Sequence, residues 1–102
     1  MWICLNDAFI SVVAKGEDTN KLCVRARRRS HLQVLFPDAE IIEGAGTDYA
    51  YRIFVDRKEV ARVIGRRLAD ISYDNFKDSV GNYDLKRAYG KVWMIMSELQ
   101  DD

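Results

Sequence analysis

Four arginines fall within five positions of the segment CVRARRRSHL, and their type and spacing suggest a chemistry. A guanidinium donates paired hydrogen bonds to carboxylate and phosphate groups, so such a cluster indicates anion binding. If the segment is a strand, Arg25 and Arg27 lie on one face, and Arg28 and Arg29 follow at its end. Three interpretations stay open: salt-dependent contact with nucleic-acid phosphates, contact with an acidic protein, and a solvated strand face that discourages aggregation.

Two further features could belong to a binding surface. The segment SYDNFKDSV (residues 72–80) predicts an ordered elbow between two helices, with its aromatic residues inward and with Asn75 and Lys77 outside. Trp93 lies just off the apolar stripe of the last predicted helix, where it either packs at a rim or anchors a partner. The candidate binding residues are Arg25, Arg27, Arg28, Arg29, Asn75, Lys77 and Trp93.

Several catalytic chemistries are excluded by residue type. His31 is the only histidine, so no two-histidine metal site or histidine-paired relay can form. Ser30 is too close to His31 along the chain to be its nucleophile, and no glycine-rich phosphate loop is present. We therefore expect a protein that is not an enzyme and that needs no metal or cofactor. An unrecognised carboxylate or tyrosine site would require titratable groups with shifted pKa values that converge in a cleft.

Length and composition predict one soluble domain over residues 1–102 with a sizeable core. The 16 basic residues equal the 16 acidic ones, but they are unevenly distributed. Residues 21–67 carry 11 basic and 6 acidic side chains, whereas residues 68–102 carry 4 and 7. There is no run of about 18 apolar residues and no signal peptide, and Cys4 and Cys23 match neither a zinc site nor a secreted disulfide scaffold. These features predict a cytoplasmic protein without membrane contact.

Strands dominate the first half of the sequence. Residues 1–15 predict one bulged strand or two short ones hinged at Asn6 and Asp7, and residues 21–28 alternate with a period of two. In that alternation Leu22, Val24 and Ala26 point one way, and Cys23, Arg25 and Arg27 the other. Two more strands are expected over residues 39–43 and 49–55, and Tyr49 and Tyr51 share the parity of the core-facing Ile53 and Val55.

Helices dominate the second half. A short helix is expected to begin at Ser30, which has Gln33 at capping-box spacing, and to end before Pro37. A longer helix follows from Asp56, and the last one is capped by Asn82 or Asp84. One apolar stripe is expected to bury the last helix: Leu85, Ala88, Tyr89, Val92, Met96 and Leu99.

This element order predicts an α+β fold. The expected architecture is an antiparallel sheet of four to five strands, formed by the N-terminal strands and then a β-α-β-β-α segment, with C-terminal helices packed on one face. Several stretches, MW, FISVVAK, LCVRAR, DYAYR, ISYDNFKDSV and AYGKVW, together resemble a family of small standalone proteins of bacteria and phages. The resemblance implies a free-standing, intracellular domain and carries over no catalytic or binding residue.

The sequence therefore predicts a non-enzymatic binding protein that acts on a protein partner through a basic and aromatic surface. An inhibitor of a host defence complex, encoded by a phage or mobile element, is one concrete form of this hypothesis. The alternative is sequence-independent nucleic-acid binding through residues 25–29. A homodimer formed through an exposed strand edge or the Trp93 helix is compatible with both, and also with an enzyme that uses an unrecognised carboxylate or tyrosine site.

Overall fold

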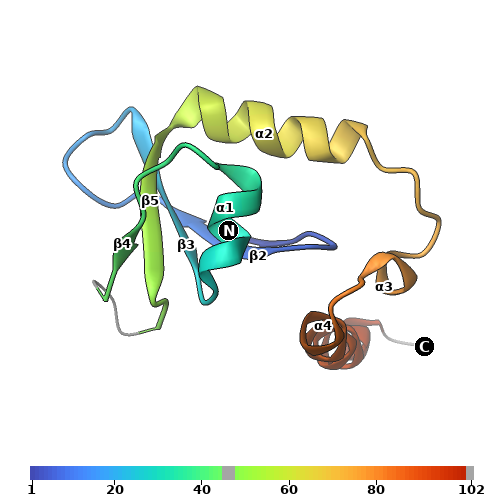
Figure 1. The fold of residues 1–102 in the computed structure, drawn as a ribbon. Helices are drawn as coiled ribbons and strands as arrows, with labels where there is room; N and C mark the ends of the chain where they lie inside the picture. The colour runs from blue at the N-terminus through green and yellow to red at the C-terminus, as the bar shows by residue number, and fades with distance from the viewer. Residues whose placement is uncertain (45–47, 101–102) are drawn as a thin grey trace.

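The computed structural model describes residues 1–44 and 48–100, and it contains one five-stranded antiparallel sheet (Figure 1). The strand order is β1-β2-β3-β5-β4. The strands are β1 (Trp2–Cys4), β2 (Phe9–Val13), β3 (Lys21–Ala26), β4 (Ile42–Glu43) and β5 (Tyr51–Asp56). The N-terminal segment thus forms two strands that turn at Asn6 and Asp7, and the predicted α+β fold is confirmed.

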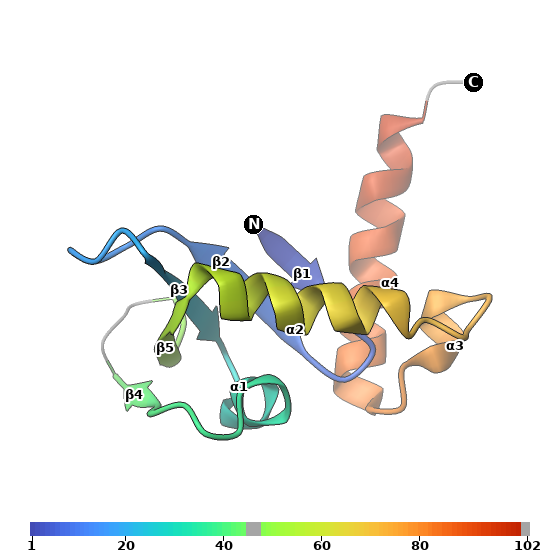
Figure 2. The same cartoon turned by 90° about the horizontal axis from the view of Figure 1, so that it is seen from above.

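The helices lie in two groups. They are α1 (Arg29–Leu35), α2 (Arg57–Ala69), α3 (Phe76–Ser79) and α4 (Tyr83–Met96), which continues into a 3₁₀ turn, η1 (Ser97–Leu99). Helices α1 and α2 pack against β3 and β5 and cover one face of the sheet. Helices α3 and α4 lie beside the turn between β1 and β2 (Figure 2).

The main core lies between the sheet and helices α1 and α2. The alternation predicted for residues 21–28 is confirmed, because Val24 and Ala26 are fully buried in this core together with Ile10 and Ile53. Leu32 of α1 packs against the same residues. Strands β2, β3 and β5 therefore each give one set of alternate side chains to the core and leave the other set on the opposite face of the sheet.

The predicted start of α1 is wrong by one residue, whereas its end is correct. Arg28, in an extended backbone conformation, is the residue that precedes the helix, so Ser30 lies inside the first turn. A residue inside the turn has a helical backbone and does not occupy the capping position. The helix ends at Leu35, two residues before Pro37. The strand expected over 39–43 is limited to Ile42 and Glu43.

A second, smaller core holds α4 in place. Val80, Leu85 and Tyr89 are buried there, and Phe9 and Phe76 pack against them. The Tyr89 hydroxyl lies 2.9 Å from the carbonyl oxygens of Leu5 and Ala8, both in the β1–β2 turn. Asn82, one of the two predicted caps, accepts a hydrogen bond from the Leu85 amide at 3.0 Å.

The prediction that the apolar stripe of α4 is buried along its length is wrong. Leu85 and Tyr89 are buried, but Ala88, Val92, Met96 and Leu99 are exposed. The helix extends past the small core, so the second half of the stripe has no part of the described chain to cover it (Figure 2).

Candidate binding surface

The face of the sheet turned away from α1 and α2 carries two of the four predicted arginines, Arg25 and Arg27. Strand register places Trp2, Ser11, Arg25 and Arg52 in one row across β1, β2, β3 and β5. Arg25 and Arg52 are therefore directly opposite each other on neighbouring strands. Like charges in this arrangement repel, which destabilises the sheet unless an anion lies nearby.

Two arginines on this face stack on one aromatic ring. The guanidinium carbons of Arg25 and Arg27 lie 4.6 and 4.4 Å from the centroid of the Tyr49 ring. Arg25 also donates a hydrogen bond from Nη2 to Ser11 Oγ at 2.7 Å. Tyr49 is buried, as predicted, but against these arginines and not among the core residues that cluster beneath α1 and α2. It precedes β5, which begins at Tyr51, so the alternation of the strand does not extend to it.

The arginines divide into paired and unpaired ones. Arg28 forms an ion pair with Asp84 at 2.9 Å, and Arg29 forms one with Glu43. Within residues 1–44 and 48–100, by contrast, Arg25, Arg27 and Arg52 form no ion pair. We call these three residues the arginine face.

Burial makes the missing counter-charge costly. The Nε atoms of Arg25 and Arg52 are buried and have no hydrogen-bond acceptor among the described residues. A buried, unpaired donor on a charged group loses its hydration without compensation. Arg52 was not among the candidate residues predicted from the sequence. Its position next to the core-facing Ile53 places it on the opposite face of the strand, and this could have identified it.

The two cysteines are not activated. Both are free thiols, and burial raises the pKa of each. At Cys23 the nearby charges of Arg52 and Arg25 lower the pKa in the opposite direction, but burial has the larger effect. Since the thiolate is the nucleophilic form, a raised pKa opposes reactivity.

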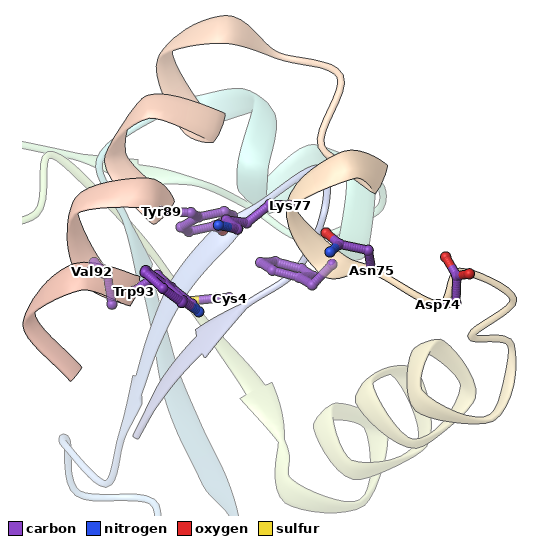
Figure 3. A pocket seen from close by; sticks show the side chains of 8 residues that line it. Cys4, Asp74, Asn75, Lys77, Tyr89, Val92 and Trp93 are labelled. Carbon is purple, nitrogen blue, oxygen red and sulfur yellow. The ribbon is translucent and has the colours of Figure 1, made fainter. Parts of the chain in front are cut away.

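The other predicted site residues gather around a cavity of about 410 Å³ between β1, α3 and α4 (Figure 3). The residues that line it are Cys4, Asp74, Asn75, Phe76, Lys77, Tyr89, Val92 and Trp93. The Lys77 ammonium lies 4.3 Å from the centroid of the Trp93 ring, a cation–π contact. The Asn75 side-chain oxygen accepts a hydrogen bond from the Asp78 amide and caps α3, so Asn75 has a structural role as well as lining the cavity.

Phe9 connects the arginine face to the cavity. Its ring lies 6.0 Å from the guanidinium of Arg27, and it is paired across the strands with Cys4, which lines the cavity. The structure thus brings Arg25 and Arg27 together with Arg52, and Asn75 with Lys77 and Trp93. Arg28 and Arg29 do not join either group, because Asp84 and Glu43 hold them in ion pairs.

His31 is engaged in the fold. Its Nδ1 accepts a hydrogen bond from the Phe9 amide at 3.2 Å, and burial lowers its pKa. Among the described residues, no group of three histidine, cysteine or acidic side chains is placed to hold a metal ion. In the same part of the chain, no helix has the length and apolar character needed to cross a membrane.

Comparison with known protein families, with curated proteins and with solved structures found no match for this chain. The resemblance to the bacterial and phage family stays a prediction, and the functional argument rests on the residues themselves. They form a surface with a largely apolar cavity at one end and, at the other, three arginines that have no ion pair among the described residues.

Proposed function

We propose that this chain is a non-enzymatic protein-binding domain. Its arginine face and cavity together contact an acidic segment of a partner protein that also carries a large apolar side chain. The observation that supports this function is the set of three arginines on one sheet face that form no ion pair within the described residues. A carboxylate from a partner would supply the counter-charge and would accept hydrogen bonds from the guanidinium groups.

The cavity favours a protein partner over a partner that binds through charge alone. Phe76, Tyr89, Val92 and Trp93 give it aromatic and aliphatic walls, and such pockets accept the buried anchor residues that dominate binding energy in protein interfaces. Lys77, stacked on Trp93, adds a positive charge at the rim. A partner segment with acidic residues beside one apolar anchor fits both halves of the surface.

Nucleic-acid binding is the second candidate. It is favoured by the same arginines together with the Trp2 ring, which is 77% exposed and could stack on a base. The ion pairs of two neighbouring arginines weigh against it. Arg28 and Arg29, which would extend the contact along a phosphate backbone, are neutralised by Asp84 and Glu43.

The experiment compares labelled probes by fluorescence anisotropy at low and at physiological salt. The probes are a short polyglutamate peptide with one central tryptophan, the same peptide without tryptophan, and random single-stranded DNA and RNA of equal length. We expect the tryptophan peptide to bind most tightly, because it alone engages both the arginines and the cavity.

Two charge reversals make the test specific. Arg27→Glu removes an exposed arginine of the surface, and Arg62→Glu makes the same change on α2, where Arg62 forms an ion pair with Glu59. Arg27→Glu should weaken peptide binding by about tenfold or more, and Arg62→Glu should leave it unchanged. Tighter binding of the oligonucleotides, with a steep loss on adding salt, would favour the second candidate. No binding by any probe at low salt would refute both.

A further inference from the structure

The second half of α4 projects from the rest of the molecule (Figure 2). Between Val92 and Leu99 its large apolar side chains are 47% to 75% exposed. These side chains are Val92, Trp93, Met94, Ile95, Met96 and Leu99. Six such residues within eight positions form an apolar surface of a kind that monomeric proteins rarely leave uncovered.

The exposed side chains continue a regular heptad pattern. Leu85, Tyr89, Val92, Met96 and Leu99 follow one another at spacings of four, three, four and three, which is the a/d seam of a coiled coil. The small core covers the first two of these residues. The remaining three belong to the same seam, and no described part of the chain covers them.

Helix stability also requires a contact here. A helix of this length is marginal in water without packing, because nucleation is unfavourable and only tertiary contacts offset it. The exposed half contains Val92, Trp93 and Ile95, whose side chains lose rotamer freedom in a helix. Propensity alone therefore does not explain why this segment is helical.

We propose that a second copy of this chain covers the seam, with the two α4 helices packed antiparallel across a two-fold axis near Ile95 and Met96. A two-fold contact requires one self-complementary patch, and a short seam of three aliphatic residues provides it. In that arrangement Val92 of one copy packs against Leu99 of the other, and Met96 packs near the axis.

The available area matches a weak, reversible dimer. A large apolar side chain offers on the order of 150 to 200 Å² when fully exposed, so the five that lie in or beside the seam offer roughly 500 Å² per copy at about 60% exposure. These are Val92, Trp93, Ile95, Met96 and Leu99. Burying most of this area on both copies gives on the order of 800 Å², the size of a weak, transient interface. The dimer should therefore form in the high micromolar range.

Charge order favours the antiparallel orientation. Lys91 precedes the seam and Glu98 lies near its end. Two antiparallel helices place the basic end of each beside the acidic end of the other, whereas parallel helices would align like charges. The dimer leaves the arginine face free, but it covers Val92 and Trp93, which also line the cavity of the proposed binding surface.

Sedimentation equilibrium of the full chain tests the proposal with two methionines as a matched pair. Met96 lies in the seam and is 56% exposed, whereas Met94 is 65% exposed and lies two positions away, on nearly the opposite side of the helix. The wild type and Met94→Glu should dimerise in the high micromolar range. Met96→Glu should weaken dimerisation by about 30-fold or more, the change expected for a central interface residue.

Because Met96 is exposed within one copy, Met96→Glu should keep the folded circular dichroism spectrum of the wild type, so a monomeric result would not reflect unfolding. A wild-type chain that stays monomeric at about 1 mM would overturn the proposal, as would equal effects of the two glutamates. The relative orientation of the two α4 helices is tested by disulfide crosslinking of chains that carry Cys4→Ser, which removes the exposed native thiol. A mixture of Val92→Cys and Leu99→Cys chains should form mixed disulfide dimers, and efficient crosslinking of Val92→Cys alone would refute the antiparallel arrangement.

Discussion

The hydroxyl of Tyr89 is the best-defined polar link between α4 and the sheet, and its removal should have a measurable cost. It lies 2.9 Å from two carbonyl oxygens of the β1–β2 turn, those of Leu5 and Ala8. Ala8 O also accepts a bond from the Leu5 amide at 2.8 Å, so Tyr89→Phe removes the side-chain donor to the part-buried Leu5 O and one of the two donors to the buried Ala8 O. We expect a loss of about 1 to 2 kcal/mol in the free energy of unfolding.

Urea unfolding followed by far-UV circular dichroism measures this loss. Each kcal/mol lowers the Tm of a domain of this size by about 4 to 8 °C, so thermal unfolding gives a second readout. Tyr83→Phe is the matched control, since Tyr83 begins the same helix but is 76% exposed, whereas Tyr89 is 6% exposed. The control should change stability by less than about 0.5 kcal/mol. Equal effects of the two substitutions would show that the Tyr89 hydroxyl does not hold the helix.

The difference in free energy of unfolding between the wild type and Tyr89→Phe should also depend on pH. Burial raises the pKa of Tyr89 well above its usual value. The unfolded chain ionises this phenol near pH 10, and the folded chain ionises it only at higher pH, so the wild type loses stability as pH rises above about 10. The Tyr89→Phe variant has no such loss from this position, and the gap between the two proteins should narrow in that range. A stability difference that grows above pH 10 would contradict a raised pKa for Tyr89.

Four other substitutions test local features. His31 accepts a backbone hydrogen bond, and burial lowers its pKa, so its contribution to the free energy of unfolding is present above about pH 6.5 and is lost as pH falls. His31→Asn keeps an acceptor, so the free energy of unfolding measured in urea should depend less on pH between about pH 5 and 8. Gly90→Ala should stabilise α4 by about 0.5 to 1 kcal/mol, because open space surrounds the position of the added Cβ atom. Gly16→Ala should destabilise the protein, because Gly16 has a φ of +95°, which alanine rarely adopts. Asp84→Asn should cost less than about 0.5 kcal/mol in the same assay, since its ion pair with Arg28 is solvent-exposed.

Local patterns predicted the elements well. The alternation over residues 21–28 gave the correct two faces of β3, since side-chain direction in a strand depends only on sequence parity. Pro37 gave the correct end of α1 for a similarly local reason. The start of α1 was wrong because Ser30 and Gln33 have the spacing of a capping box, but spacing does not fix which residue adopts the extended conformation.

The candidate site depended on non-local structure. Arg52 joins Arg25 only because β5 pairs with β3, and the 24 residues between those strands hide this neighbour relation from sequence patterns. The ion pairs of Arg28 and Arg29 likewise depend on where Asp84 and Glu43 lie in space. The stripe on α4 was correctly identified as apolar, but periodicity cannot show how much of a stripe the rest of the chain covers.

The small core beneath α4 also has a consequence for how the molecule opens. Val80, Leu85 and Tyr89, with Phe9 and Phe76, hold α3 and α4 to the sheet, whereas the main core joins four strands to two helices. Regions with few buried contacts open locally at lower free energy than the whole domain. Native-state hydrogen exchange should therefore divide the chain into two cooperative units. Amides of α4 should exchange through undocking of the C-terminal helices, and those of β3 and β5 only through global unfolding.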